Sequence, residues 1–228
     1  MLDILMVTDY VCPYCLVAKE AMEQALRETG IEARIRTQPF ELTEEPKARV
    51  DTYHDENRKA HYKILVEPAR ELGLDMKLPP AVIPRPYTRL AFEGWYFACE
   101  KNCGDEYNDL MYRAYFIEES DIGDLEVLVR LAEKIGLDGK EYRAALLEGA
   151  YCAKEKEAVA YAKDVLRVKT VPTIYINGNR ISVERYTRQE MAEILRQEEK
   201  RSGGNAPEGE TSEEGKRAGF CCGVDGCG

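Results

Sequence analysis

The sequence predicts an α/β protein in which a β-α-β unit and a later β-β-α unit enclose a long, all-helical insertion. Three observations predict this order. A short apolar run near the start is followed by a helical pattern and then by an alternating pattern. Only helical patterns fill about residues 51–166, and Asn177-Gly178-Asn179 separates two short strand-like runs near the end. Asn-Gly between such runs is a strong hairpin signal.

The composition is that of a folded globular protein. Of the 228 residues, 44% are hydrophobic and 32% are charged, which is too apolar for a disordered chain. A net charge of −10 argues against binding to nucleic-acid phosphates or to anionic membranes. We find no run approaching about 18 apolar residues, so no membrane span is predicted. The first nine residues lack a basic n-region, so we expect no signal peptide and a cytoplasmic location.

The first half of the predicted core occupies residues 1–50. The apolar run Ile4–Val7 is typical of a strand buried on both faces. Apolar residues then recur at spacings of three and four up to Leu26, which predicts a helix that Gly30 ends. Alternation over residues 31–36 predicts a second strand, and the order β-helix-β begins a βαβ unit.

The insertion, residues 51–150, is predicted to be helical throughout. Pro68 interrupts its first helix, and the proline-rich stretch 79–86 reads as an extended connection. Helices are expected at 88–101, 105–116, 124–135 and 138–148, and each of the last three begins with an acidic capping candidate. His54 and His61 share one face of the first helix and are expected to be surface residues. Six aromatic residues are expected to pack the insertion: Trp95, Tyr96, Phe97, Tyr112, Tyr115 and Phe116.

The second half of the core is expected over residues 151–201. A helix over 151–166 leads to strands at 173–176 and 180–183, and an amphipathic helix over 187–201 follows. The order of elements is that of a thioredoxin-like core with a helical lid inserted in it. Residues 202–228 hold eight of the seventeen glycines and three of the eight cysteines, which predicts a disordered tail with a cysteine-rich tip.

The motif that carries chemistry is Cys12-Pro13-Tyr14-Cys15, placed where the first strand meets the first helix. Pro13 suits the first helical position. Cys12 therefore lies at the helix N-terminus, where unpaired amides and the helix dipole favour a thiolate. Cys15, three residues on, shares its helix face and can attack a mixed disulfide on Cys12. We expect Cys15 to be the more buried. A C-x-x-C alone also matches half a zinc site.

Taken together, these features make the sequence similar to the DsbA-like thioredoxin family, and within it to the cytoplasmic FrnE-like branch. The segments that carry the resemblance are Cys12–Cys15, Glu71–Met76, Leu110–Phe116, Asp121–Leu128 and Val171–Thr173. The resemblance implies a thiol-disulfide oxidoreductase in which Cys12 attacks and Cys15 resolves. It also implies that Val171-Pro172 forms a cis-proline loop against the cysteines and offers its backbone to an extended substrate.

Substrates and partners follow from the same resemblance. Pro13, Tyr14, Val171 and Pro172 would contact a protein disulfide or a small-molecule disulfide or thiol. No organic cofactor or resident metal is implied; glutathione is a candidate co-substrate, and glutathione or a thioredoxin system would recycle the cysteines. Related 2-hydroxychromene-2-carboxylate isomerases and kappa-class glutathione transferases usually carry Ser at the Cys12 position. The two cysteines here argue against that branch; a glutathione-dependent isomerase or transferase, in which Cys12 does not turn over as a dithiol, is one alternative function.

The remaining cysteines are candidates for secondary redox chemistry. Cys99 and Cys103 are four residues apart at the end of a helix, with Cα atoms about 6 Å apart on ideal geometry. They form either a second redox pair or two separate thiols. Cys221, Cys222 and Cys227 on the flexible tail would shuttle electrons to Cys12–Cys15, capture a soft metal or metalloid, or have no role. Capture of a soft ion would make the chain a metal-binding protein, which is the second alternative.

Overall fold

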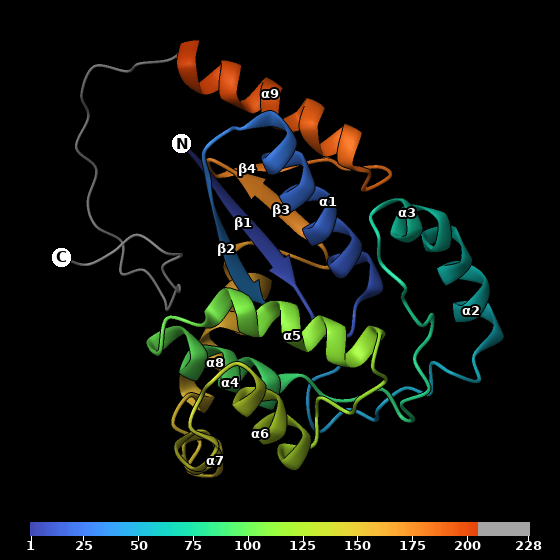
Figure 1. Ribbon diagram of the computed structural model, residues 1–228, viewed down its shortest axis with the longest axis vertical. Coiled ribbons are helices and arrows are strands. Elements are labelled where there is room, and N and C mark those ends of the chain that lie inside the picture. The colour runs from blue at the N-terminus through green and yellow to red at the C-terminus, as the bar shows by residue number, and fades with distance from the viewer. Residues whose placement is uncertain (205–228) are drawn as a thin grey trace.

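A mixed four-stranded sheet lies at the centre of the protein, as the computed structural model shows for the described residues, 1–204 (Figure 1). Its strands are β1 (Leu2–Thr8), β2 (Ala33–Pro39), β3 (Thr173–Ile176) and β4 (Asn179–Ile181), in the spatial order β2-β1-β3-β4. β1 is parallel to β2 and antiparallel to β3, and β3 is antiparallel to β4. This is the thioredoxin-like core that the sequence predicts.

The register of the central strands determines which chain segments lie next to the end of β1. Val7 pairs with Thr173 at the start of β3, and Thr8 pairs with Pro39 at the end of β2. The chain leaving β1 therefore comes close to the segment that enters β3. Residues just beyond position 8 and just before position 173 are brought together by this pairing, although they are far apart in sequence.

Helix α1 (Pro13–Thr29) follows β1 and packs with the last helix, α9 (Arg188–Gly204), on one side of the sheet (Figure 1). Its inward face is built from small and flexible apolar side chains that join a core cluster with β1, β3 and α9. Gly30 ends α1 in a left-handed conformation, with φ of +66°, and its N–H donates to the Leu26 carbonyl. Glycine adopts this conformation without steric cost, so the predicted C-terminal cap is confirmed.

The insertion between β2 and β3 is helical, as expected. Its elements are α2 (Glu56–Tyr62), the 3₁₀ turn η1 (Lys63–Leu65), α3 (Val66–Glu71), α4 (Arg89–Glu100), α5 (Gly104–Phe116), α6 (Leu125–Lys134), α7 (Gly139–Leu147), α8 (Cys152–Ala160) and the π-helical turn η2 (Tyr161–Val165). Figure 1 shows α4–α8 gathered beyond the ends of β1 and β2, while α2 and α3 form a separate arm beside α1.

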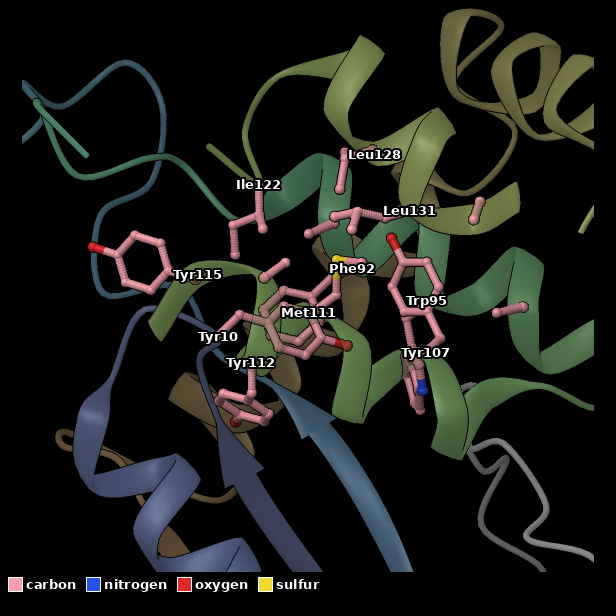
Figure 2. Packing of buried hydrophobic residues seen from close by; sticks show 14 of the residues in the cluster. Tyr10, Phe92, Trp95, Tyr107, Met111, Tyr112, Tyr115, Ile122, Leu128 and Leu131 are labelled. Carbon is pink, nitrogen blue, oxygen red and sulfur yellow. The ribbon is translucent and has the colours of Figure 1, made fainter. Parts of the chain in front are cut away.

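The core of the insertion is aromatic and continues into the β1–α1 junction. Tyr10 stacks on Phe92 with ring centroids 4.4 Å apart and meets Tyr112 edge-on at 5.3 Å (Figure 2). Cys12 and Cys15 belong to this same cluster of buried residues. The six aromatic residues predicted to pack the insertion are all buried, which confirms that expectation: Trp95, Tyr96, Phe97, Tyr112, Tyr115 and Phe116.

The strand boundaries differ from those predicted. β2 runs over 33–39, because the ladder with β1 continues through Pro39. β4 spans 179–181 and includes Asn179, so the hairpin turn has two residues. Asn177 and Gly178 both have positive φ, +51° and +81°, which is the combination that a type I′ turn needs.

Two of the three predicted acidic caps are confirmed. Asp124 accepts a hydrogen bond from Val127 N, and Asp138 accepts one from Glu141 N. The third is wrong, because α5 begins at Gly104 and its N-cap is Cys103, which places the predicted acidic cap inside the first turn. Among residues 1–204, none of the helices combines the length and the apolar character that a membrane span requires.

Candidate active site

The two cysteines of the motif lie at the junction of β1 and α1. Cys12 is the N-cap of α1 in an extended conformation, and Pro13 is the first helical residue. The N–H of Cys15 donates to the Cys12 carbonyl at 3.0 Å, which fixes the first turn. Both cysteines are free thiols; Cys12 is 4% exposed and Cys15 is 0% exposed. Cys15 is the more deeply buried of the two, as the sequence predicts.

The surroundings of Cys15 keep it protonated. Burial raises the pKa of its thiol well above the ordinary cysteine value, and the hydrogen bond to the Cys12 sulfur raises it further. The Thr8 hydroxyl and the Asp9 backbone hydrogen-bond to the same sulfur and oppose this effect. The two cysteines are therefore chemically distinct, with Cys15 held as a neutral thiol behind Cys12.

The Val171–Pro172 segment lies directly against Cys12. The peptide bond between Val171 and Pro172 is cis. The Cys12 thiol donates to the Val171 carbonyl oxygen, with 3.5 Å between Sγ and O. Both Val171 and Pro172 are half-buried, so part of this loop is open to solvent beside the cysteine. The structure thus brings together four of the predicted residues, since Cys12 and Cys15 share the site with this pair.

Three ring side chains form a rim beside Cys12. The Tyr14 hydroxyl and His61 Nε2 are 2.9 Å apart, and the Tyr14 ring meets the Tyr186 ring at 6.3 Å. Burial is the largest cause that raises the pKa of both phenols; Cys12 adds to it for Tyr14, and Cys15 followed by Cys12 adds to it for Tyr186. Tyr14 was predicted. His61 on α2 is exposed, as the sequence predicts, but its contact with Tyr14 was missed, as was that of Tyr186 before α9, because no local pattern indicates either contact.

Buried Asp9 holds the loop that carries Cys12. Its carboxylate accepts hydrogen bonds from Leu42 N at 2.7 Å and from Val11 N at 3.4 Å. Its backbone carbonyl accepts from Cys12 N at 3.0 Å. Burial raises the pKa of this carboxyl, against the hydrogen bonds that lower it. Asp9 therefore ties the β1–α1 loop to the chain that follows β2.

Of the candidates for secondary redox chemistry, Cys99 and Cys103 lie within the described residues. Cys103 is a free thiol whose Sγ lies 3.3 Å from the Lys101 carbonyl oxygen, so of the two alternatives for Cys99 and Cys103, a disulfide between them is not formed. Cys221, Cys222 and Cys227 lie outside the described residues. Within residues 1–204 no group of three His, Cys, Asp or Glu side chains is arranged to hold a metal ion.

Comparison with known proteins finds a relative in Bacillus subtilis and solved structures of similar fold. The chain is 38% identical over 170 residues to the uncharacterized protein YwbO of Bacillus subtilis (strain 168), covering 74% of this chain and 84% of the relative. Its fold is similar to that of a probable DsbA oxidoreductase, SCO1869, from Streptomyces coelicolor. That structure has a TM-score of 0.76 and 23% identity, with 99% of this chain and 100% of that chain covered.

A second solved structure with this fold is the cytosolic disulfide reductase DsbM from Pseudomonas aeruginosa with GSH. It has a TM-score of 0.65 and 13% identity, with 87% of this chain and 99% of that chain covered. The family model for the DSBA-like thioredoxin domain matches residues 3–193, nearly all of the part that the structure describes. The chain therefore belongs to the DsbA-like thioredoxin domain family.

Proposed function

We propose that this protein is a thiol-disulfide oxidoreductase that exchanges disulfides through Cys12 and Cys15. One observation carries the proposal: two free thiols share the first turn of α1, and the outer one lies 3.5 Å from the Val171 carbonyl oxygen. A thiolate at a helix N-terminus is a good nucleophile, and a buried second thiol beside it resolves the adduct. Membership of the DsbA-like family supports the same reaction type.

The reaction proceeds in two exchanges. The Cys12 thiolate attacks one sulfur of a substrate disulfide, which forms a Cys12–substrate bond and releases the other sulfur as a thiolate. Cys15 then attacks Cys12 Sγ, so that the Cys12–Cys15 disulfide forms and the second substrate thiol leaves. The substrate is reduced by two electrons and the protein is oxidised by two. Run backwards, the same steps oxidise a substrate dithiol.

The substrate is held by the residues around Cys12. The carbonyl of Val171 is available to accept a hydrogen bond from an extended substrate backbone once Cys12 is engaged in the mixed disulfide. Pro13 follows Cys12 as the first residue of α1, Pro172 follows Val171 after the cis bond, and Tyr14 bounds the site on the side of α2 through its contact with His61. Backbone groups and the rings of proline and tyrosine make up most of this site. Such a site suits both an extended protein segment and a small-molecule disulfide.

Glutathione is the co-substrate that we propose for recycling, with no organic cofactor. The structural similarity to DsbM, which was solved with GSH, supports this choice. A reducing glutathione pool would return the Cys12–Cys15 disulfide to two thiols, and an oxidising one would do the reverse. We place this chemistry in the cytoplasm, in agreement with the cytosolic location given for DsbM.

Trapping of the mixed disulfide tests the proposal. The Cys15→Ser variant, mixed with oxidised glutathione, is expected to accumulate one glutathione on Cys12, whereas the wild type goes on to the internal disulfide. Cys12→Ser is the matched control and is expected to form neither species. If Cys15→Ser retains full glutathione-dependent turnover, the dithiol mechanism is contradicted, and the monothiol isomerase or transferase alternative is favoured instead. Intact mass and peptide mapping distinguish the three species.

A further inference from the structure

The resolving step requires a thiolate at a position from which water is excluded. Cys15 is 0% exposed, and burial raises the pKa of its thiol. A charge that forms there has no solvent to stabilise it, so the stabilisation must come from hydrogen-bond donors of the protein. The groups around the Cys15 sulfur therefore decide how fast Cys15 attacks the mixed disulfide.

Two buried hydroxyl groups, those of Thr8 and Tyr112, lie close to the Cys15 sulfur. Thr8, the last residue of β1, is 5% exposed and hydrogen-bonds to the Cys15 sulfur. Tyr112 on α5 is 2% exposed, and its hydroxyl makes a hydrogen bond with Thr8 Oγ1. Figure 2 shows the Tyr112 side chain extending from α5 toward the end of β1. The order of groups is Tyr112, Thr8, Cys15.

The direction of the hydrogen bond between Tyr112 and Thr8 decides which group can donate to the Cys15 sulfur. A threonine hydroxyl has a single proton to donate and can accept at its lone pairs. When Tyr112 donates to Thr8 Oγ1, the Thr8 proton is left for the sulfur. Tyr112 is held in this position by its edge-on contact with Tyr10, whose own hydroxyl donates to Asn108 Oδ1 at 2.5 Å. In that arrangement a donor to Cys15 is in place before the reaction begins.

We propose that Thr8 is a catalytic residue of the resolving step, that its hydroxyl donates to Cys15 as the thiolate forms, and that Tyr112 is the positioning residue that orients it. The proposal rests on the dithiol function above. In this step the Cys15–Cys12 bond forms and the bond between Cys12 and the substrate sulfur breaks. The proton that Cys15 loses passes to the departing substrate sulfur, or to solvent where that sulfur leaves as a thiolate. The two hydroxyl groups gain and lose no proton; they stabilise the developing charge.

A two-phase reaction with the aromatic disulfide DTNB separates the relevant steps. Attack by Cys12 releases a first coloured thiolate, and resolution by Cys15 releases a second, so stopped-flow absorbance gives both rates. In Thr8→Val the second phase is expected to slow about tenfold or more, because a hydrogen bond to a charged group is lost. The first phase is expected to stay within about twofold. Thr8→Ser is expected to restore the second phase, and Tyr112→Phe to slow it about threefold to tenfold.

Tyr107→Phe is the matched control. Tyr107 is equally buried on α5, but its hydroxyl bonds to the Tyr142 hydroxyl at 2.6 Å, so its loss is expected to leave both phases unchanged. The proposal is overturned if Thr8→Val matches the wild type, or if both phases slow together. Should Thr8→Val fail to fold, Tyr112→Phe decides by the same criterion. A wild type that releases no second thiolate contradicts the dithiol function itself, which separates the two failures.

Discussion

Cys12 and Val171 are 159 positions apart in sequence, yet the Cys12 thiol donates to the Val171 carbonyl oxygen at 3.5 Å. The contact follows from strand register, because β1 and β3 pair as Val7 with Thr173. The segment between them contains the whole helical insertion, of which helices α4–α8 lie beyond the same end of the sheet (Figure 1). The active site is therefore assembled by the core strands and enclosed by the insertion.

Cys12 is expected to be alkylated at least about tenfold faster than Cys15 in the folded, reduced protein at pH 7. Cys15 is fully buried and the pKa of its thiol is raised, and only the thiolate reacts. Iodoacetamide labelling followed by peptide mass spectrometry gives both rates. In guanidinium the difference is expected to disappear. Equal rates in the native protein would contradict the distinct roles assigned to the two cysteines.

Glu155 is expected to make stability fall as pH rises. It is 0% exposed on α8, and burial, followed by the charge of Glu41, raises its pKa to about 9. Burial likewise raises the pKa of Glu41 to about 7. Between the ordinary glutamate pKa and these values the folded state keeps protons that the unfolded state releases. The stabilisation is therefore complete below about pH 4.5 and is lost as pH rises through 7 and 9.

Replacing Glu155 with a side chain that does not titrate is expected to flatten the dependence of stability on pH. Glu155→Gln should be more stable than the wild type at pH 8.5 by about 1–3 kcal/mol and should lose less stability between pH 5.5 and 8.5. Urea unfolding across this range measures the difference. Glu157→Gln, at an exposed position of the same helix, serves as the control and is expected to follow the wild type. Parallel curves for Glu155→Gln and wild type would contradict the assigned burial.

Gly94→Ala is expected to destabilise the insertion by about 1–3 kcal/mol, because a Cβ at this position overlaps two buried hydroxyl groups. These are the hydroxyls of Tyr142 and Tyr107, which hydrogen-bond to each other. Thermal unfolding measures the loss. Adding Tyr142→Phe to Gly94→Ala is expected to recover part of it, since one of the two clashing oxygens is then absent. No loss in Gly94→Ala would show that α4 packs less closely than described.

The parts of the fold that depend on local pattern could be predicted from the sequence. Gly30 as the end of α1 and Asp124 and Asp138 as helix caps follow from chemistry within one turn of the residue itself. The end of β2 could not be predicted, because Thr37–Pro39 shows no apolar alternation. Those residues become a strand only through pairing with β1. Long-range pairing, and not propensity, sets that boundary.

In the candidate active site, too, local features could be predicted from the sequence and long-range contacts could not. Cys12 and Cys15 are recognisable because their spacing and their position before a helix carry the chemistry. Thr8 and Tyr112 are 104 positions apart and look like ordinary core residues in sequence. His61 likewise meets Tyr14 only after α2 has folded against the β1–α1 junction. Contacts of this kind depend on tertiary packing, so no motif reveals them.

A glutathione redox titration of the full-length protein tests the central claim most directly. Alkylation and peptide mass spectrometry would report the state of Cys12 and Cys15 at each ratio of reduced to oxidised glutathione. We predict one intramolecular Cys12–Cys15 disulfide in equilibrium with glutathione. A midpoint near about −200 mV or above indicates an oxidant or isomerase, and one near about −270 mV indicates a reductase. The absence of a Cys12–Cys15 disulfide at every ratio would contradict the proposed function.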